Sequence, residues 1–337
     1  MPLPWLILLS DPEGLKLSAP PRPLTKAALD KLLDVAQGHG VLPATVSNLS
    51  AVTAMGCADL VATGGKKDIE TILASKKALL RTGTGLSLLL RQQSNNVMKA
   101  LSARSIPAFI LKGADFADRL YNPPSLRPFT DVDIMVPCDA MADVSTVLQG
   151  LGYRQTRGNL KYTPSGYGQQ VWAPDSLPGC KIEIHWDLVN SPAVRRKVSC
   201  SFHDLQFENS SEDSQPVPSA ASLLLIASIH AATSHSYDRL LLLYDIRQIC
   251  LGKAGKLDTT YLSEAVNRSG WSTAVRSGLH LCGSVLKSEE CLDLADRLML
   301  DMPVYLKVLI TPPMLQRGPN RIDTLRRNIF REVLKRI

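Results

Sequence analysis

The sequence predicts an α+β protein in which a small mixed β-sheet lies between an N-terminal and a C-terminal helical segment. Apolar residues recur at helical spacing up to residue 104 and again after residue 217, whereas short apolar or alternating runs fill much of the region between. Of the 337 residues, 45% are hydrophobic and 20% are charged, which is typical of a soluble globular protein. We expect a helical segment over 1–104, an α/β core over 105–190 and a C-terminal helical domain with a basic tail over 191–337.

The N-terminal segment carries two helical patterns. Apolar residues at three- and four-residue spacing predict helices over Lys26–Ala36 and Ile69–Leu101. Gly83 and Gly85 are expected to interrupt the second helix, because glycine is a poor helix former. The run Gly64–Lys67 is predicted to be the turn that precedes this helix.

The central region alternates between short strands and short helices. An apolar run that ends in Lys112 and Gly113 predicts the first strand, and a run that contains two aspartates predicts the second. The predicted strands are Ile106–Leu111, Asp131–Val136, two weaker ones near Tyr153 and at Gln170–Ala173, and Lys181–Val189, with helices over Ala114–Tyr121 and Asp139–Leu151.

The C-terminal region is predicted to be helical after a polar loop over residues 190–217. The expected helices are Ala220–Thr233, Tyr237–Cys250, Tyr261–Val266, Thr273–Val285 and Glu289–Met299. A last helix is expected at the end of the chain, where apolar residues form a stripe among arginines. The members of this stripe are Ile322, Leu325, Ile329, Val333 and Ile337.

The net charge of +7 is concentrated in the tail 307–337, which holds eight Lys or Arg residues and two acidic ones. Such a tail can bind a polyanion such as nucleic acid, or it can be the solvated face of the terminal helix. We favour the solvated face and keep nucleic acid as a second interpretation.

Several classes of protein are excluded by composition. The seven cysteines are scattered and form no CxxC pair, which argues against a disulfide framework and against a thiolate zinc site. No apolar run approaches the roughly 18 residues that a membrane span needs. The N-terminal run Pro4–Leu9 is too short for a secretory signal and lacks its basic flank. We therefore expect a cytoplasmic protein without a membrane partner.

Asp131 and Asp133 are the first candidate functional residues. In a strand, residues two apart project from the same face, so both carboxylates would lie together while Val132 and Ile134 face the core. Neighbouring carboxylates repel each other unless a cation lies between them, and Mg²⁺ is a hard cation that prefers such oxygen ligands. A metal site and an ordinary solvated strand end both remain open for this pair alone.

A second acidic strand strengthens the metal interpretation. In Lys181–Val189, Glu183, His185 and Asp187 are expected on one face, and Ile182, Ile184 and Trp186 on the other. A third carboxylate on a neighbouring strand would complete a site for two metal ions. We choose Glu183 for this role, with Asp187 in reserve. His185 is expected either to support a ligand or to be an ordinary hydrogen-bonded sheet histidine.

Residues near the first strand fit phosphate binding. Lys112 and Gly113 lie where a strand leads into a helix, and backbone N–H groups at a helix start favour anions. Gly113 would allow a phosphate to approach the backbone. Arg127 could place its guanidinium against a triphosphate. Ordinary surface charge remains the alternative for Lys112 and Arg127.

Together these motifs resemble the nucleotidyltransferase superfamily of the polymerase-β type, and more narrowly its bacterial branch of uncharacterised nucleotidyltransferases. The resemblance spans about residues 28–285 and is specific only as a set. It rests on Ile110–Gly113, Leu120–Tyr121, Arg127, Thr130–Ile134, Ile182–Trp186 and, outside the predicted sheet, His39–Val41, His230, His235, Arg239 and Asp245–Ile246.

The resemblance implies a nucleotidyltransferase core over 105–190, a two-metal site for Mg²⁺ or Mn²⁺, and a nucleoside triphosphate such as ATP as substrate. The implied metal ligands and catalytic residues are Asp131, Asp133 and Glu183, and the implied nucleotide-binding residues are Lys112, Gly113, Arg127 and Thr130. One departure from the superfamily concerns Gly113, which is followed by Ala114 and Asp115 where the superfamily has Ser or Gly.

A further group of residues is expected to surround the site. His230 and His235 are five residues apart rather than four, so a structural role is favoured over metal binding. Arg239 and Asp245 could line the cleft and contact the nucleotide. The supporting residues to examine are therefore His185, Asp187, His230, His235, Arg239 and Asp245.

The leading functional hypothesis is an enzyme that transfers a nucleoside monophosphate to an unknown acceptor, which is a small molecule, a peptide or protein, or RNA. The first alternative is a catalytically weak or inactive module of the same fold that binds a nucleotide or a partner, motivated by the altered glycine motif. The second is a nucleic-acid-acting transferase that uses the basic tail, and its affinity would fall steeply with salt.

Overall fold

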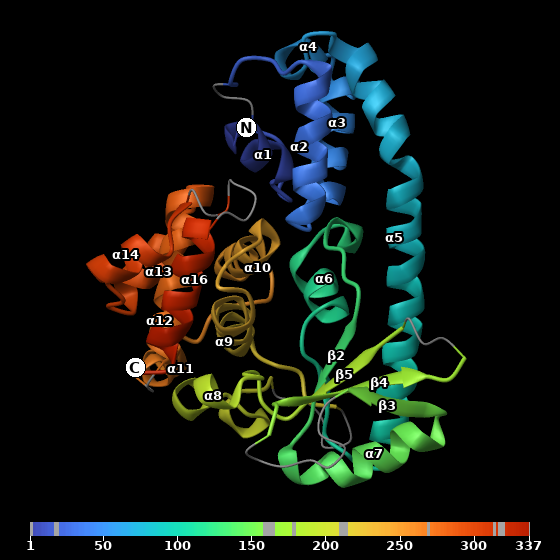
Figure 1. Ribbon diagram of the computed structural model, residues 1–337, viewed down its shortest axis with the longest axis vertical. Helices are drawn as coiled ribbons and strands as arrows, with labels where there is room; N and C mark the ends of the chain where they lie inside the picture. Colours follow the sequence, from blue (N-terminus) through green and yellow to red (C-terminus); the bar gives the residue numbers. More distant parts are fainter. Residues whose placement is uncertain are drawn as a thin grey trace.

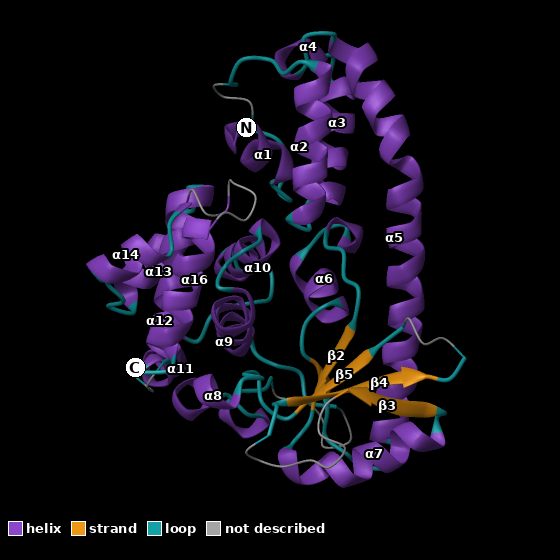
Figure 2. Cartoon of the chain, viewed as in Figure 1, coloured by secondary structure: helices purple, strands orange, loops and turns teal. Residues whose placement is uncertain are grey.

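The computed structural model describes residues 3–16, 20–157, 166–176, 180–208, 215–267, 270–312, 315 and 321–336. It confirms the α+β class, with one five-stranded mixed sheet and helices on both sides (Figures 1 and 2). Within the described part of the chain, the helices are too short or too polar to cross a membrane.

The N-terminal helices stand above the sheet in Figure 1. The side chain of Thr25 accepts a hydrogen bond from Ala28 N and so caps the start of the second helix. The longest helix joins this group to the sheet. The helices are α1 (Leu3–Ser10), α2 (Lys26–Gly38), α3 (Leu42–Ala54), α4 (Ala58–Val61) and α5 (Gly65–Ser102).

Helix α5 differs from its prediction because Gly83 and Gly85 do not interrupt it. A Cβ atom at either glycine would meet nothing within 4 Å. Each glycine costs about 1 kcal/mol relative to alanine in a helix. The two ends of α5 are buried in separate hydrophobic clusters, through Ile69 at one end and Leu101 at the other. This burial fixes the ends, so the middle stays helical.

The sheet has the strand order β1-β2-β5-β4-β3. Strand β2 pairs in parallel with β5, and the other neighbours are antiparallel, which confirms a mixed sheet. The strands are β1 (Phe109–Ile110), β2 (Val132–Met135), β3 (Tyr153–Arg157), β4 (Gln169–Pro174) and β5 (Ile182–His185).

One face of the sheet is covered by α7 (Met141–Gly150) and the lower part of α5 (Figure 1). Ile134 and Ile184 are fully buried on this face, as the alternating pattern predicts. Asp133 and Glu183 therefore project from the opposite face, on the side of the helices that follow the sheet.

The remaining helices surround this second face. Helix α8 (Pro192–Val198) lies in the segment 190–217, which was predicted to be a loop. Residues 209–214 of that segment lie outside the described residues. The other elements are η1 (Pro124–Leu126), α6 (Ala114–Leu120), η2 (Cys138–Ala140), α8 (Pro192–Val198), η3 (Phe202–Asp204), α9 (Ala220–His230), the π-helical turns η4 (Ala231–His235) and η5 (Cys282–Leu286), α10 (Leu240–Cys250), α11 (Thr259–Val266), α12 (Trp271–Leu281), α13 (Glu289–Arg297), α14 (Val304–Leu309) and α16 (Arg321–Leu334).

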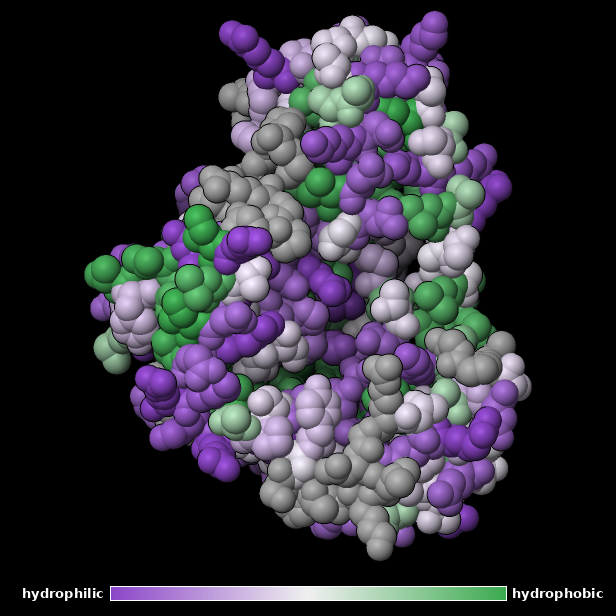
Figure 3. All heavy atoms as spheres, in the orientation of Figure 1, coloured by the Kyte–Doolittle hydropathy of each residue, from purple (hydrophilic) through white to green (hydrophobic). Residues whose placement is uncertain are grey.

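The basic tail forms the predicted terminal helix, but the apolar stripe is not its buried face. Ile322 and Leu325 are 64% and 59% exposed, whereas Phe330 and Leu334 are fully buried. Figure 3 shows apolar side chains gathered on the surface around α14 and α16, at the left of the view. Arg317 and Ile337 lie outside the described residues.

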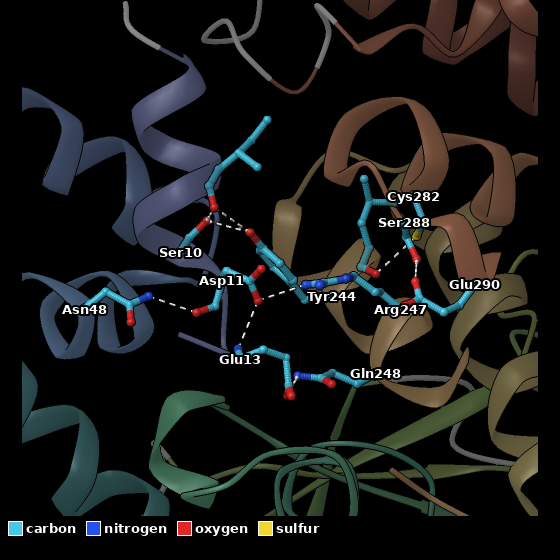
Figure 4. A network of polar contacts seen from close by, with 12 residues as sticks. Ser10, Asp11, Glu13, Asn48, Tyr244, Arg247, Gln248, Cys282, Ser288 and Glu290 are labelled. Carbon is cyan, nitrogen blue, oxygen red and sulfur yellow. Dashed lines mark hydrogen bonds and ion pairs between the residues drawn. The ribbon is translucent and has the colours of Figure 1, made fainter. Parts of the chain in front are cut away.

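The N-terminal and C-terminal helices share one hydrophobic core. Helix α1 also forms polar contacts with α10, which Figure 4 shows from close by. Ser10 Oγ lies 3.0 Å from Tyr244 Oη, and Arg247 Nη1 donates to Asp11 Oδ1 at 2.8 Å. The first and last helical segments therefore support each other, and the sheet is held beneath them.

Candidate active site

The two predicted acidic strands are neighbours in the sheet. In the parallel register of β2 and β5, Asp133 lies opposite Glu183, and Met135 lies opposite His185. Residues opposite each other in adjacent strands project from the same face. The register therefore brings together two carboxylates that are 50 positions apart in the sequence.

His185 completes a compact group of ligand atoms with these two carboxylates. Its Nε2 lies 3.0 Å from Asp133 Oδ1 and 3.8 Å from Glu183 Oε2. One ligand atom from each of the three residues lies within 4.8 Å of the others. Asp133 is only 1% exposed, so the group lies beneath the protein surface. These residues have the chemistry and spacing to hold a divalent cation.

Lys112 is the cation that contacts this acid cluster of Asp131, Asp133 and Glu183. Its Nζ pairs with Asp133 Oδ2 and lies 4.0 Å from Asp131 Oδ1. Burial alone would lower the pKa of Lys112, but the charges of Asp133 and Asp131 raise it above its ordinary value. The ammonium group is therefore charged and lies between the buried carboxylate and the more exposed one.

The acid cluster nevertheless holds more negative than positive charge. Repulsion from Asp133, together with burial, raises the pKa of Asp131. Burial and the charge of Asp133 raise the pKa of Glu183 in the same way. Burial would also raise the pKa of Asp133, but Lys112 and His185 more than offset it, and this pKa lies below its usual range. Among the described residues, Lys112 thus stabilises mainly Asp133, and its more distant contact with Asp131 does not offset the raised pKa of that carboxyl.

Gly113 forms the turn between β1 and α6 with φ of +64°, a conformation that favours glycine. Its carbonyl oxygen accepts a hydrogen bond of 3.2 Å from Arg127 Nη1. The same guanidinium forms a two-bond ion pair with Asp245 at 2.7 Å for each bond, and Tyr121 Oη also donates to Asp245. Arg127 therefore fixes the Gly113 turn to α10. Its guanidinium, which was expected to contact a triphosphate, forms its two-bond ion pair with Asp245 instead.

A cleft of about 1050 Å³ is lined by Asp131 of the acid cluster and by Lys112, which pairs with Asp133. This volume lies at the upper end of the range for small-molecule sites, roughly 300–1,000 Å³. The cleft is lined by all four predicted nucleotide-binding residues and by residues from α3, the middle of α5 and the loop before β2. Lining residues include Lys112, Gly113, Arg127, Thr130, Asp131, His230, His235, Arg239, Leu42, Leu80 and Ser87.

The predicted histidines lie on the far wall of this cleft, at the start and end of one π-helical turn. The rings of His230 and His235 meet edge to face with centroids 5.0 Å apart, and His235 Nδ1 lies 3.3 Å from Asp238 Oδ1. Burial lowers the pKa of His230 well below its usual value, and the nearby Lys112 adds to the effect. His230 is therefore a neutral imidazole beside the cleft. Such π-helical turns frequently occur at functional sites.

Asp187 does not join the acid cluster. Strand β5 ends at His185, so the alternation that placed Asp187 beside Glu183 does not continue. Its carboxylate accepts hydrogen bonds from Ser199 Oγ at 2.5 Å and from Val189 N at 2.7 Å. Asp187 thus organises the loop that follows the strand.

Two polar residues support Glu183 and were not singled out from the sequence. Gln169 Nε2 donates to Glu183 Oε2 at 2.6 Å, and Asn190 Nδ2 donates to Gln169 Oε1 at 2.5 Å. Gln169 lies opposite His185 in the antiparallel pair β4–β5, on the same face. The buried position of Gln169 in a strand would have been the available signal, because buried amides need hydrogen-bond partners.

Comparison with known proteins confirms the resemblance drawn from the motifs. The model of a protein family described as "Uncharacterised nucleotidyltransferase" matches residues 25–287, which is well over half of the chain. No curated protein matches the chain.

Proposed function

We infer the activity from the site and the family together: the chain belongs to the uncharacterised nucleotidyltransferase family, and we propose that it transfers a nucleoside monophosphate from a nucleoside triphosphate to an acceptor. The observation that carries this proposal is the acid cluster beside a cleft large enough for a nucleotide, with Asp131 and Lys112 lining the cleft. We assign Asp131, Asp133 and Glu183 as its catalytic carboxylates.

The unmatched negative charge of the acid cluster supports a divalent metal cofactor, Mg²⁺ or Mn²⁺. Lys112 stabilises the ionised form of Asp133, whereas the pKa values of Asp131 and Glu183 are raised. Such a charge excess fits one or two divalent cations held by these three carboxylates, with His185 Nε2 as a nitrogen ligand beside them. A bound divalent cation would neutralise the triphosphate and lower the pKa of the acceptor hydroxyl.

The protein residues would position the donor and handle the proton. Lys112 pairs with Asp133 and also lines the cleft. From this position its ammonium would leave Asp133 and pair with the triphosphate when the donor binds. The Gly113 turn and Thr130 line the cleft and are placed there to contact phosphate oxygens. Arg127 acts as a positioning residue, because it holds the Gly113 carbonyl and is itself held by Asp245.

The transfer itself is a displacement at the α-phosphorus. An acceptor hydroxyl or phosphate oxygen forms a bond to this phosphorus, while the bond from the phosphorus to the oxygen that bridges to the β-phosphate breaks. Pyrophosphate leaves with that electron pair. Where the acceptor group is a hydroxyl, its proton passes to Glu183, whose raised pKa suits a proton acceptor. In-line geometry and charge neutralisation supply the catalysis.

A label-transfer screen tests this function. The protein is incubated with each α-³²P-labelled nucleoside triphosphate, with Mg²⁺ or Mn²⁺, and with a cell extract as the source of acceptor. The Asp131→Asn, Asp133→Asn double variant serves as the control, because these substitutions remove two charges at nearly constant volume. We expect label on a protein, an RNA or a small molecule only with the wild type.

Two results would contradict the assignment. Equal labelling by the double variant would remove the acid cluster from the chemistry. Tight, metal-dependent nucleotide binding without transfer to any fraction would instead favour a binding module of the same fold, which the Ala114 and Asp115 that follow Gly113 already make a reasonable second candidate.

A further inference from the structure

A second cavity also borders the π-helical turn η4. It has a volume of about 570 Å³ and is lined by residues from the loop before α8, from η4 and from the basic helix α16. Thr233 and Ser234 line this cavity, whereas His230 and His235 of the same stretch line the cleft. Neighbouring residues of one short stretch therefore line both hollows.

The second cavity is connected to the acid cluster by a short hydrogen-bond chain. Asn190 lines the cavity and donates to Gln169, which donates to Glu183. One side chain thus separates a cavity residue from a catalytic carboxylate. Asn190 Oδ1 is buried and has no hydrogen-bond partner among the described residues. The cleft meets the acid cluster through Asp131.

The cavity wall carries an unmatched cation. Lys335 pairs with Glu332 at 2.5 Å. Within the described part of the chain, the half-buried guanidinium of Arg331 forms no hydrogen bond or ion pair. Helix α16 is held in this place by Phe330, which is fully buried and packs against Tyr237 with ring centroids 6.1 Å apart. The arginine is therefore presented to the cavity from a fixed element.

We propose that this cavity is the acceptor site and that Arg331 binds an anionic oxygen group, a phosphate or a carboxylate, of a small polar acceptor. The inference rests on the proposed transferase function. In that reaction the attacking oxygen and the departing pyrophosphate lie roughly in line on opposite sides of the α-phosphorus. Of the acid cluster, Asp131 lines the cleft, and Glu183 is linked to the second cavity through Gln169 and Asn190, so a donor bound in the cleft leaves the second cavity for the acceptor. Arginine suits such a group because its planar fork binds carboxylate and phosphate with two bonds.

Binding of simple anions tests the site without knowledge of the natural acceptor. The Arg331→Gln variant is compared with the wild type and with Arg336→Gln, which removes the same charge from an exposed residue in the last turn of the same helix region. Inorganic phosphate and acetate are titrated calorimetrically at constant ionic strength. Donor binding is measured separately, with a non-transferable α,β-methylene triphosphate analogue and Mg²⁺.

We expect the wild type and Arg336→Gln to bind at least one of the two anions, and Arg331→Gln to bind it at least about tenfold more weakly. Phosphate preference would indicate a phosphorylated acceptor and acetate preference a carboxylate one. The triphosphate analogue should bind all three proteins equally and should not be displaced by the anion.

The proposal is overturned if neither anion binds the wild type, if Arg331→Gln binds as well as the wild type, or if the anion competes with the triphosphate analogue. The label-transfer screen separates this failure from that of the proposed function. If no variant transfers label while anion binding still depends on Arg331, the anion site stands and the transferase assignment fails.

Discussion

Two regions of the molecule hold groups of carboxylates and cations, and they differ in how the charge is matched. Where the end of α1 meets α10, Asp11 pairs with Arg247 at 2.8 Å (Figure 4). Nearby, Glu13 pairs with Lys253 at 2.8 Å. In the acid cluster, three carboxylates share one lysine. The first network is balanced within the chain, whereas the second is not.

The pKa values follow this difference. Burial would raise the pKa of Glu13, but the hydrogen bonds from Lys253 and Gln248 lower it below its usual value. Burial raises the pKa of Glu183, and the nearest carboxylate adds to the shift. Carboxylates that are paired with a cation of the chain thus stabilise the folded state without a ligand. Carboxylates that lack such a partner would be stabilised by an added cation. Charge balance therefore separates residues that hold the fold from residues that await a ligand.

The largest expected effect is on the rate of transfer, and it contrasts Glu183 with Asp187, two acids that were predicted to lie on one strand face. Glu183→Gln should reduce transfer at least about 100-fold, the size of losing one electrostatic contact to the transition state. Asp187→Asn should leave transfer per folded molecule nearly unchanged, because Asp187 bonds only within its loop among the contacts described above. Steady-state kinetics on both variants, normalised to the folded fraction, measure this contrast. Equal losses would show that the two acids act together.

The second effect concerns the Arg127–Asp245 pair, the most buried balanced pair. Asp245→Asn should lower the free energy of unfolding by about 3–5 kcal/mol, because it leaves a buried guanidinium without its counter-ion. Urea unfolding measures the loss, with Asp293→Asn, an exposed position on α13, as the matched control. A loss below about 1 kcal/mol would mean that the fold does not depend on this pair.

The third effect is a pH dependence of stability at Asp115, a carboxyl outside the acid cluster that lies 3.9 Å from Arg119 Nη1. Burial raises its pKa to about 6 from 3.8, although Arg119 partly offsets the shift. Because the pKa of Asp115 is higher in the folded state, its protonation stabilises the fold fully below pH about 4, and this stabilisation is lost as the pH rises to about 6. A shift of about two pKa units limits the contribution to the free energy of unfolding to about 3 kcal/mol.

Asp115→Asn cannot ionise, so its stability relative to the wild type should rise between pH 4 and pH 7. Thermal unfolding across this range measures the difference, and Asp139→Asn, at an exposed position, should show no such trend. A difference that does not change with pH would show that Asp115 titrates normally in the folded protein.

Much of the fold follows from local patterns, and the exceptions have physical causes. Alternation placed Asp133 and Glu183 opposite the core faces of their strands, as found. The pattern could not show that β5 ends at His185, because that end depends on Ser199 and Cys200, which lie far along the chain and bond to Asp187. Pairing between distant segments is therefore what the sequence does not reveal.

The site shows the same division. The carboxylates, Lys112, Gly113 and Arg127 were identified by residue type and position, whereas Thr130, His230, His235 and Arg239 came from the resemblance. The role of Arg127 depends on its contact with Asp245, 118 positions away. Only that contact distinguishes an arginine that binds phosphate from one that fixes the Gly113 turn. Likewise, the burial of Phe330 rather than Ile322 decides which face of α16 meets the protein.

The smallest effect on stability is expected where the end of α1 meets α10 (Figure 4). It tests whether the more buried of the two ion pairs contributes more to the free energy of unfolding. The Lys253 side chain is 39% exposed and that of Arg247 is 10% exposed. Lys253→Gln should cost less than about 1 kcal/mol of unfolding free energy, since water and salt screen exposed pairs. Arg247→Gln should cost more, about 1–3 kcal/mol, because Asp11 then loses a buried charged partner.

Urea unfolding at low and high salt separates the two contributions. Added salt should remove the difference between Lys253→Gln and the wild type and should leave most of the Arg247→Gln loss in place, because buried pairs are screened less. Neither variant should change transfer, since Arg247 pairs with Asp11 and Lys253 pairs with Glu13, and neither acid belongs to the acid cluster. If Arg247→Gln lowered transfer in fully folded protein, the separation between a structural and a functional charge network would fail, because the contact between α1 and α10 would then extend its influence to the acid cluster.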